Sequence, residues 1–200
     1  MSANPPLYLA SASPRRQELL RQIGVDFVLL APDPDEDAEA LEVPLRGEAP
    51  APYVARVTLL KLDAARERLR RRALPPAPVL CADTTVALGR RILGKPANHA
   101  EALEMLRLLG GRNHRVLTAV AVAWAGGSAS RLSVSHVQMD AIDVGRREAY
   151  VASGEPFGKA GGYGIQGRAA GFISRISGSY SGIMGLPLYE TTQLLKQAGI

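Results

Sequence analysis

The segment at residues 10–16, which reads ASASPRR, constrains the fold of this chain more than any other stretch. It lies between an apolar run at residues 7–10, typical of a buried strand, and residues 17–24, whose apolar spacing and closing glycine predict a helix. Ser13 suits the N-cap position of that helix, and Pro14 suits its first turn. We therefore expect a strand that passes through a tight loop directly into a helix.

Arg15 and Arg16 are placed against the usual charge preference of a helix. Both fall in the first turn, where free backbone N–H groups and the helix dipole favour negative charge. Two cations beside free N–H groups make a strong anion site, most naturally for phosphate. The alternative is that both arginines extend into water and serve no ligand.

The length and composition favour one domain that works inside the cell. Two hundred residues suffice for one sizeable core, so we expect a single domain over residues 1–200. No apolar run approaches the roughly 20 residues that span a bilayer, and residues 1–6 lack the basic and apolar regions of a signal peptide. The lone cysteine excludes an internal disulfide, and the three histidines have no metal-ligand spacing. We expect a cytoplasmic protein that has no membrane partner.

The net charge of +5 raises the question of nucleic acid. Much of this charge comes from an arginine cluster near the end of one predicted helix, namely Arg66, Arg68, Arg70, Arg71 and Arg72. Cations there complement the helix dipole, so a solvated helix end explains them better. Aromatic residues are scarce and are not interleaved with this cluster, which disfavours a nucleic-acid partner.

Strands and helices alternate along the rest of the chain. Strands are predicted at residues 25–30, 79–82, 115–124, 130–139 and 172–176, with a hairpin at residues 84–93 and an acidic loop at residues 33–42. Helices are predicted at residues 52–72, 98–109, 146–153 and 187–198. Because hairpins interrupt the βαβ rhythm, the pattern predicts a mixed α/β sheet and not a doubly wound one.

Three charged residues are candidates for a site, and each has a structural alternative. Asp83 follows the apolar strand at residues 79–82, and ligands of α/β sheets gather at the carboxyl ends of strands. An acid there can deprotonate water or hold a divalent cation, or it can simply cap the next turn. Lys61 lies on an apolar helix face and Lys95 lies in a turn, so each either reaches a phosphate or extends into water.

Residues 162–167, GYGIQG, fit the glycine pattern of dinucleotide-binding folds letter for letter. That pattern needs a preceding strand and a following helix, whereas here a helix and a loop precede it and a strand follows. We therefore reject a Rossmann site. The functional interpretation is a glycine loop that brings Gln166 against a ligand, because an amide can pair with a base edge. The alternative is a structural turn.

Seven short segments, taken in order, resemble the Maf family of nucleoside triphosphate pyrophosphatases, once described as septum-formation inhibitors. The segments are SASPRR (11–16), ADT (82–84), GKP (94–96), HRVLT (114–118), KAGGYGIQG (159–167), GSY (178–180) and GLPL (185–188). They cover nearly the whole chain, and their ordered combination is specific although each is weak alone. The resemblance implies an α/β fold of the Maf and ITPase type, with an elongated mixed sheet flanked by helices and two lobes around a nucleotide cleft.

The resemblance also implies hydrolysis of a nucleoside triphosphate to the monophosphate and pyrophosphate, with magnesium or manganese as cofactor. Matched by position, Asp83 is the proton acceptor, and Asp83 and Glu36 are the metal residues. The implied substrate-binding residues are Ser13, Arg15, Arg16, Lys61, Lys95 and Gln166. Arg15, Thr84 and Gln166 match the specificity positions, and they resemble the branch that acts on dTTP and UTP and accepts some modified pyrimidine triphosphates. A homodimer is implied as well.

Two other functions compete with this interpretation. One is a nucleic-acid-binding regulator of cell division or septum formation, suggested by the charge and the older family name. Such a binder has no need for Asp83 and Glu36 in one cleft. The other is a phosphatase that removes only the γ-phosphate. Release of pyrophosphate from dTTP, set against salt-dependent retention on DNA, separates these functions.

Overall fold

One mixed sheet runs through the part of the chain that the structure, a computed structural model, describes: residues 7–33, 36 and 40–200. Residues 1–6, which are expected to carry no signal peptide, and residues 34–35 and 37–39 of the acidic loop lie outside the described residues. The strands are β1 (Leu7–Leu9), β2 (Phe27–Leu29), β3 (Val79–Leu88), β4 (Arg91–Leu93), β5 (Asn113–Trp124), β6 (Gly127–Met139) and β7 (Ile173–Ser177). Their order is β2-β1-β3-β5-β6-β7, with β4 paired to β3.

The pairing of these strands is parallel at one edge and antiparallel elsewhere. β1 runs parallel to both β2 and β3, whereas β3–β4, β3–β5, β5–β6 and β6–β7 are antiparallel pairs. The long β5–β6 hairpin and the short β3–β4 hairpin are the predicted interruptions of the βαβ rhythm. The mixed α/β sheet is therefore confirmed.

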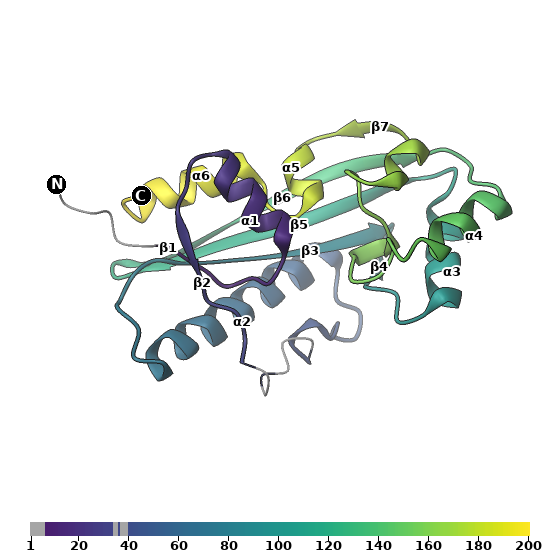
Figure 1. The fold of residues 1–200 in the computed structure, drawn as a ribbon. Coiled ribbons are helices and arrows are strands. Elements are labelled where there is room, and N and C mark those ends of the chain that lie inside the picture. The colour runs from purple at the N-terminus through teal and green to yellow at the C-terminus, as the bar shows by residue number, and fades with distance from the viewer. Residues whose placement is uncertain (1–6, 34–35, 37–39) are drawn as a thin grey trace.

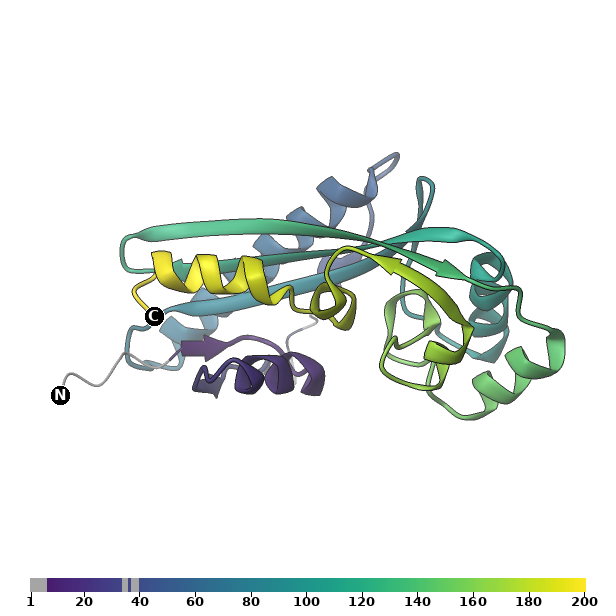
Figure 2. The same ribbon diagram turned by 90° about the horizontal axis from the view of Figure 1, so that it is seen from above.

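Helices cover both faces of this sheet. The α-helices are α1 (Pro14–Gln22), α2 (Pro50–Arg71), α3 (His99–Leu109), α4 (Val144–Ala152), α5 (Tyr180–Met184) and α6 (Leu188–Gln197). The 3₁₀ helices are η1 (Ala40–Glu42), η2 (Ala160–Gly162) and η3 (Arg168–Phe172). Figures 1 and 2 show α2 on one face, α1, α5 and α6 on the other, and α3 and α4 at the far end of the sheet. Among the described residues, no helix is long and apolar enough to cross a membrane.

The alternation of side chains along β3 assigns its residues to the two faces. Leu80 and Ala82 pack with the cluster that includes α1 and α6, whereas Val79 and Cys81 pack with the cluster that includes α2. Since successive side chains of a strand point to opposite faces, Asp83 belongs to the α2 face and Thr84 to the α1 face. A third buried cluster joins α3, α4, η2 and η3 at the far end, and it forms a second lobe.

The outer edge of β3 has a gap in its pairing. β1 pairs with it at Val79 and Leu80, and β4 pairs with it from Val86 to Leu88. Within the described residues, no strand covers this edge at residues 81–85. Residues 82–85 in this gap line a cleft, although they lie in the middle of a strand.

The structure corrects two expectations about local structure. The strand that was expected to end at residue 82 continues through Asp83 to Leu88, so Asp83 lies within a strand and not at its carboxyl end. The polar run at residues 83–85 resembles the end of a strand, but Asp83 pairs with Lys61 on one face and Thr84 with Thr118 on the other. The five-residue helix α5 was also missed, because residues 180–184 are too few to show a helical period.

Candidate active site

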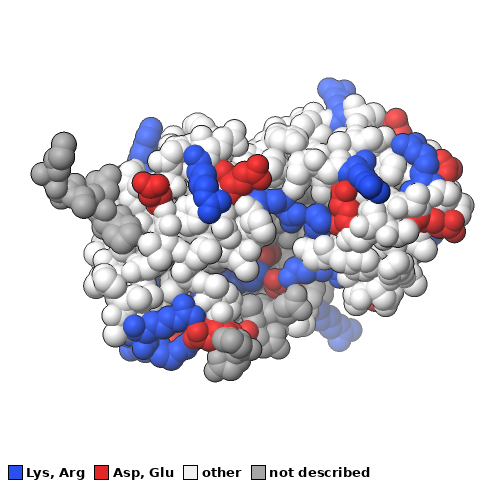
Figure 3. All heavy atoms as spheres, in the orientation of Figure 1, with Lys and Arg blue, Asp and Glu red and all other residues white. Residues whose placement is uncertain are grey.

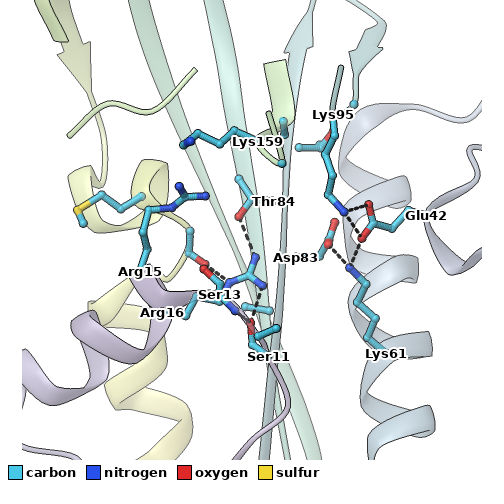
Figure 4. Close-up of a pocket in the computed structure, with 18 of the residues that line it drawn as sticks. Ser11, Ser13, Arg15, Arg16, Glu42, Lys61, Asp83, Thr84, Lys95 and Lys159 are labelled. Atoms are coloured by element: carbon cyan, nitrogen blue, oxygen red, sulfur yellow. Dashed lines mark hydrogen bonds and ion pairs between the residues drawn. The ribbon is translucent and has the colours of Figure 1, made fainter. Parts of the chain in front are cut away.

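A cleft of about 660 Å³ opens along the gap in the edge of β3. It is lined by the loop before α1, by the cleft-facing side of α2 and η1, and by the glycine loop of the second lobe. In Figure 3 this hollow lies between the two lobes, and basic and acidic side chains gather in it. All the sequence-predicted site residues line this one cleft: Ser13, Arg15, Arg16, Glu36, Lys61, Asp83, Thr84, Lys95 and Gln166. Figure 4 shows the residues at the start of α1 on one side of Asp83 and Thr84, and Lys61, Glu42 and Lys95 on the other.

The start of α1 presents free N–H groups to the cleft. Ser13 occupies the N-cap position as predicted, but within the described part of the chain its side chain makes no capping hydrogen bond. Its own backbone N–H donates to Ser11 Oγ at 3.2 Å, which fixes the loop before the helix. Because no side chain of a described residue caps the first turn, its N–H groups remain available to an anion.

Arg16 is tied into the protein, whereas Arg15 is not. The Arg16 guanidinium donates to the carbonyl O of Gly185 at 2.7 Å, to Ser11 Oγ at 3.2 Å and to Thr84 Oγ1 at 3.4 Å. Burial lowers the pKa of Arg16, and the nearby Asp83 carboxylate opposes that effect. Arg15 is half-buried and makes no hydrogen bond to a described residue. The alternative that both arginines extend into water is therefore wrong for Arg16.

On the other face of β3, Lys61 joins two carboxylates. Its Nζ lies 2.6 Å from Asp83 Oδ1 and 2.7 Å from Glu42 Oε1. Asp83 is only 6% exposed, so this carboxylate depends on Lys61 for its charge compensation. Lys95, in the turn after β4, also pairs with Glu42. Its Nζ lies 3.0 Å from Glu42 Oε2. Neither lysine simply extends into solvent.

Glu42 is the functional candidate that the sequence pattern did not single out. It ends η1, and its backbone carbonyl accepts a hydrogen bond of 2.7 Å from Tyr53 Oη. Burial alone would raise the pKa of Glu42, but Lys61 and Lys95 together hold it below its usual value. The only sequence signal was a carboxylate near the end of a long acidic loop, and several other acids share that loop.

Glu36 lines the cleft, but its carboxylate is engaged elsewhere. It accepts hydrogen bonds from Arg68 and from Arg71, and these partners lower its pKa to about 2. Arg68 is 4% exposed and also donates to the carbonyl O of Leu30 at 3.0 Å. The expectation of a fully solvated arginine cluster is therefore wrong for Arg68. The other cluster members pair with acids of α2 or of the loop at residues 33–36.

The glycine loop of the second lobe closes the cleft. η2 and η3 flank the GYGIQG segment and β7 follows it, which is the context that excludes a dinucleotide-binding turn. Gly161 has a φ of +70°, and a Cβ there would lie 2.9 Å from the Val86 side chain, so this packing requires glycine. Tyr163 lines the cleft, and its hydroxyl lies 2.7 Å from His114 Nε2. Gln166 is exposed at the cleft wall.

Lys159 adds a cation that the sequence interpretation left unassigned, although it lies in the KAGGYGIQG segment. In Figure 4 its ammonium group points toward the Arg15 guanidinium. Burial, and then the charge of Arg15, lowers the pKa of Lys159. Two neighbouring cations repel each other in the free protein, so an anion between them would be strongly favoured.

The carboxylates of the cleft suit a divalent cation that arrives with phosphates. Asp83 and Glu42 both approach Lys61, so one small region already holds two anionic oxygen ligands. No group of three or more His, Cys, Asp or Glu residues that could hold a metal occurs among the described residues. Magnesium commonly takes one or two carboxylates together with substrate phosphates and water. The donor set therefore fits a metal that is completed by a nucleotide.

Comparisons with known proteins agree over nearly the whole chain. A family model described as "Maf-like protein" matches residues 6–198. A dTTP/UTP pyrophosphatase of Polaromonas sp. is 61% identical over 200 residues, covering 100% of this chain and 99% of that protein. Proteins of the same name from Albidiferax ferrireducens and Ralstonia nicotianae are 61% and 62% identical, each covering 96% of the relative and at least 96% of this chain. A solved structure of the Staphylococcus aureus Ham1 protein gives a TM-score of 0.45 at 16% identity, over 67% of this chain and 71% of that one.

Proposed function

This chain belongs to the Maf family, and from that premise we propose that it is a nucleoside triphosphate pyrophosphatase that hydrolyses dTTP and UTP to the monophosphate and pyrophosphate. Relatives named dTTP/UTP pyrophosphatase support the proposal, because their sequences are 61–62% identical to this chain over almost its full length. One structural observation carries it. A single cleft gathers the cations Arg15, Arg16, Lys61, Lys95 and Lys159 around the buried carboxylate of Asp83.

The cations and the helix start serve the phosphates. Arg15 and the uncapped N–H groups of α1 face the cleft from one side, and Lys61 and Lys95 face it from the other. A triphosphate carries several negative charges within a few ångströms, so it can compensate both sides at once. Pyrophosphate, the leaving group, would be stabilised by the same charges. Positioning and charge stabilisation supply most of the rate in phosphoryl transfer.

Asp83 is the proposed general base. Its carboxylate accepts a hydrogen bond of 2.6 Å from the Lys61 ammonium, and a carboxylate oxygen can also accept a proton. When phosphates compete for Lys61, this bond weakens and the carboxylate becomes available to a water molecule. Asp83 then takes a proton from that water while the oxygen of the water attacks the α-phosphorus. The bond between the α-phosphorus and the oxygen that bridges it to the β-phosphorus breaks, and pyrophosphate leaves.

A divalent metal, magnesium or manganese, is part of the proposal. Asp83 and Glu42 would hold it together with phosphate oxygens, and the metal would neutralise charge on the phosphates. We assign the second acid to Glu42 in place of Glu36, because Glu42 shares Lys61 with Asp83 whereas Glu36 is engaged by Arg68 and Arg71.

Base choice is assigned to Arg15, Thr84 and Gln166, as the family resemblance implies. All three line the cleft, and Gln166 lies exposed on its second-lobe wall. An amide offers a donor and an acceptor together, which can match the neighbouring carbonyl and N–H groups of thymine or uracil. We expect dTTP and UTP to exceed purine triphosphates by at least about tenfold in kcat/KM. Gln166→Glu should reduce this preference, because a carboxylate cannot donate.

The test is a panel of nucleoside triphosphates assayed for pyrophosphate release with magnesium and with manganese. Comparable hydrolysis of GTP or 7-methyl-GTP would refute the assignment to the dTTP/UTP branch, and orthophosphate as the sole product would refute the reaction. Retention on DNA that falls steeply with salt, without turnover, would favour the regulator.

A cytoplasmic location, supported by the free buried Cys81, and a homodimer remain predictions. Light scattering tests the homodimer.

A further inference from the structure

A chain of hydrogen bonds leads from Arg16 into the core. Arg16 Nη2 lies 3.4 Å from Thr84 Oγ1, Thr84 Oγ1 lies 2.9 Å from Thr118 Oγ1, and Thr118 Oγ1 lies 2.7 Å from the carbonyl O of Gly182. Thr84 and Thr118 are directly opposed in the β3–β5 pair, so their side chains share one face. Thr118 is 1% exposed and does not line the cleft. It is therefore out of reach of a substrate.

Proton counting fixes the direction of each bond in this chain. A carbonyl oxygen only accepts, so the single hydroxyl proton of Thr118 goes to Gly182. Thr118 Oγ1 is then an acceptor toward Thr84, whose own proton points at Thr118. The oxygen of Thr84 presents only lone pairs to Arg16, and a guanidinium can only donate. The orientation of each group is thus set by the next one along the chain.

Arg16 also makes a direct contact with the segment that contains Gly182. Arg16 Nε donates to the carbonyl O of Gly185 at 2.7 Å, and Gly185 directly follows α5. Gly185 has a φ of +119°, a conformation that suits glycine and turns the chain at this point. Both ends of the network, Gly182 and Gly185, therefore belong to α5 and its C-terminal turn. The direct bond to Gly185 and the bond through Thr84 constrain the plane of the guanidinium as well as its position.

We propose that Thr118 is a positioning residue for Arg16, acting through Thr84. Without the Thr118 hydroxyl, the carbonyl O of Gly182 keeps, among the described residues, only the backbone N–H of Gly185 as a donor, at 3.1 Å, and the Thr84 hydroxyl can rotate its proton toward the guanidinium. A proton directed at a cation repels it, so Arg16 keeps its charge but loses its fixed orientation. The consequence for catalysis rests on the proposed function, whereas the orientation of Arg16 does not.

Two variants of Thr118 and one matched control test this inference. Thr118→Val keeps the shape of the side chain and removes the hydroxyl, whereas Thr118→Ser keeps the hydroxyl. Thr191→Val is the control, because Thr191 is also fully buried and its hydroxyl donates to the carbonyl O of Pro187, at 2.7 Å, at the start of α6. Thermal unfolding of the three variants shows how much of any effect is a loss of stability.

The first measurement is hydrogen exchange at Arg16 Nε–H, followed by NMR in the ligand-free protein and assigned with Arg16→Lys. We expect exchange about tenfold faster in Thr118→Val than in the wild type, because exchange reports local opening of the bond to Gly185. Thr118→Ser and Thr191→Val should remain close to the wild type. An unchanged rate in Thr118→Val would overturn the inference, and this result needs no substrate.

The second measurement is a double-mutant cycle on kcat/KM for dTTP. Thr118→Val should cost about tenfold in the wild-type background but less than about twofold when Arg16 is already alanine, because the effect passes through Arg16. Thr118→Ser should restore most of the loss. An equal loss in both backgrounds would make Thr118 merely structural. If the wild type does not hydrolyse dTTP, the proposed function fails, and the exchange measurement still decides the role of Thr118.

Discussion

Asp83 and Thr84 are sequence neighbours whose side chains leave β3 on opposite faces, so one short stretch of strand serves both sides of the cleft. Asp83 meets Lys61 of α2 at 2.6 Å, and Thr84 meets Arg16 of α1 at 3.4 Å. The gap in strand pairing at residues 81–85 exposes this point to a ligand. The proposed base and the proposed anion site are thus joined through two consecutive residues, and each side can be tested separately.

Replacement of Asp83 by asparagine should abolish most of the activity without unfolding the protein. Asp83→Asn is nearly isosteric but removes the proton acceptor, so we expect turnover of dTTP to fall by about 10²-fold or more. Asp63→Asn is the matched control, since Asp63 lies exposed on α2 and pairs only loosely with Arg66, at 3.9 Å. Steady-state kinetics with thermal unfolding checks the prediction. Near wild-type turnover in a folded Asp83→Asn protein would remove Asp83 from the mechanism.

The two arginines of α1 should differ in their effect on stability. Arg15→Ala should lower activity strongly and leave the melting temperature unchanged or higher, because it removes a cation from the first turn of a helix. Arg16→Ala should lower activity as well, and also the free energy of unfolding by about 1 kcal/mol, because Gly185 and Thr84 lose a donor.

Arg21→Ala, in the last turn of α1, is the control for this pair. Its side chain contacts Gln17 and the ring of Phe27 and does not line the cleft, so kcat/KM should stay unchanged. If Arg15→Ala retains full specific activity, Arg15 plays no part in binding the phosphates.

Substitution of Glu42 should lower activity, whereas substitution of Glu36 should lower stability. Glu42→Gln should reduce kcat/KM by at least about tenfold, with a weaker response to magnesium, because one carboxylate beside Asp83 is lost. Glu36→Gln should leave kcat/KM near the wild-type value and lower the free energy of unfolding by about 2 kcal/mol, because the buried Arg68 loses its anionic partner. Kinetics and urea unfolding of both variants check this. The opposite pattern would return the metal role to Glu36.

His114 should make the stability of the protein depend on pH. Burial lowers the pKa of His114 to about 4 from its ordinary value of 6.5, so the unfolded chain binds the proton first as the pH falls. The contribution of neutral His114 to the free energy of unfolding is fully present above pH 6.5. It is lost as the pH falls from 6.5 through 4, and the total loss is up to about 3 kcal/mol. Urea unfolding at pH 7, 5.5 and 4 should show a steeper loss for the wild type than for His114→Gln. Equal slopes would contradict the prediction.

Local patterns were sufficient to predict the longer helices and most strands, since those depend on residues close in sequence, whereas the five-residue helix α5 was not predicted. The start of α1 at Pro14 and the cap of α3, where Asn98 Oδ1 accepts from the N–H of Glu101 at 3.0 Å, follow from such patterns. The continuation of β3 past Ala82 did not follow, because the polar run after it is stabilised by Lys61 and Thr118, which are distant in sequence.

The same physical reason explains which site residues could be predicted. Arg15, Arg16 and Asp83 stand out because their local context is unusual for residues that serve only stability. Glu42 has no unusual local context. Its role depends on Lys61 and Lys95, which lie 19 and 53 residues further along the chain and meet it only in the folded cleft. Contacts of this kind are a property of the tertiary structure.

The most direct test of the account is the fate of the attacking oxygen when dTTP is hydrolysed in ¹⁸O-labelled water. Attack by an Asp83-activated water on the α-phosphorus predicts that dTMP carries the label and that pyrophosphate carries none. Mass spectrometry of the two products, with Asp83→Asn as the blank, gives the answer in one experiment. Labelled orthophosphate with dTDP, or label in pyrophosphate with unlabelled dTMP, would contradict the account.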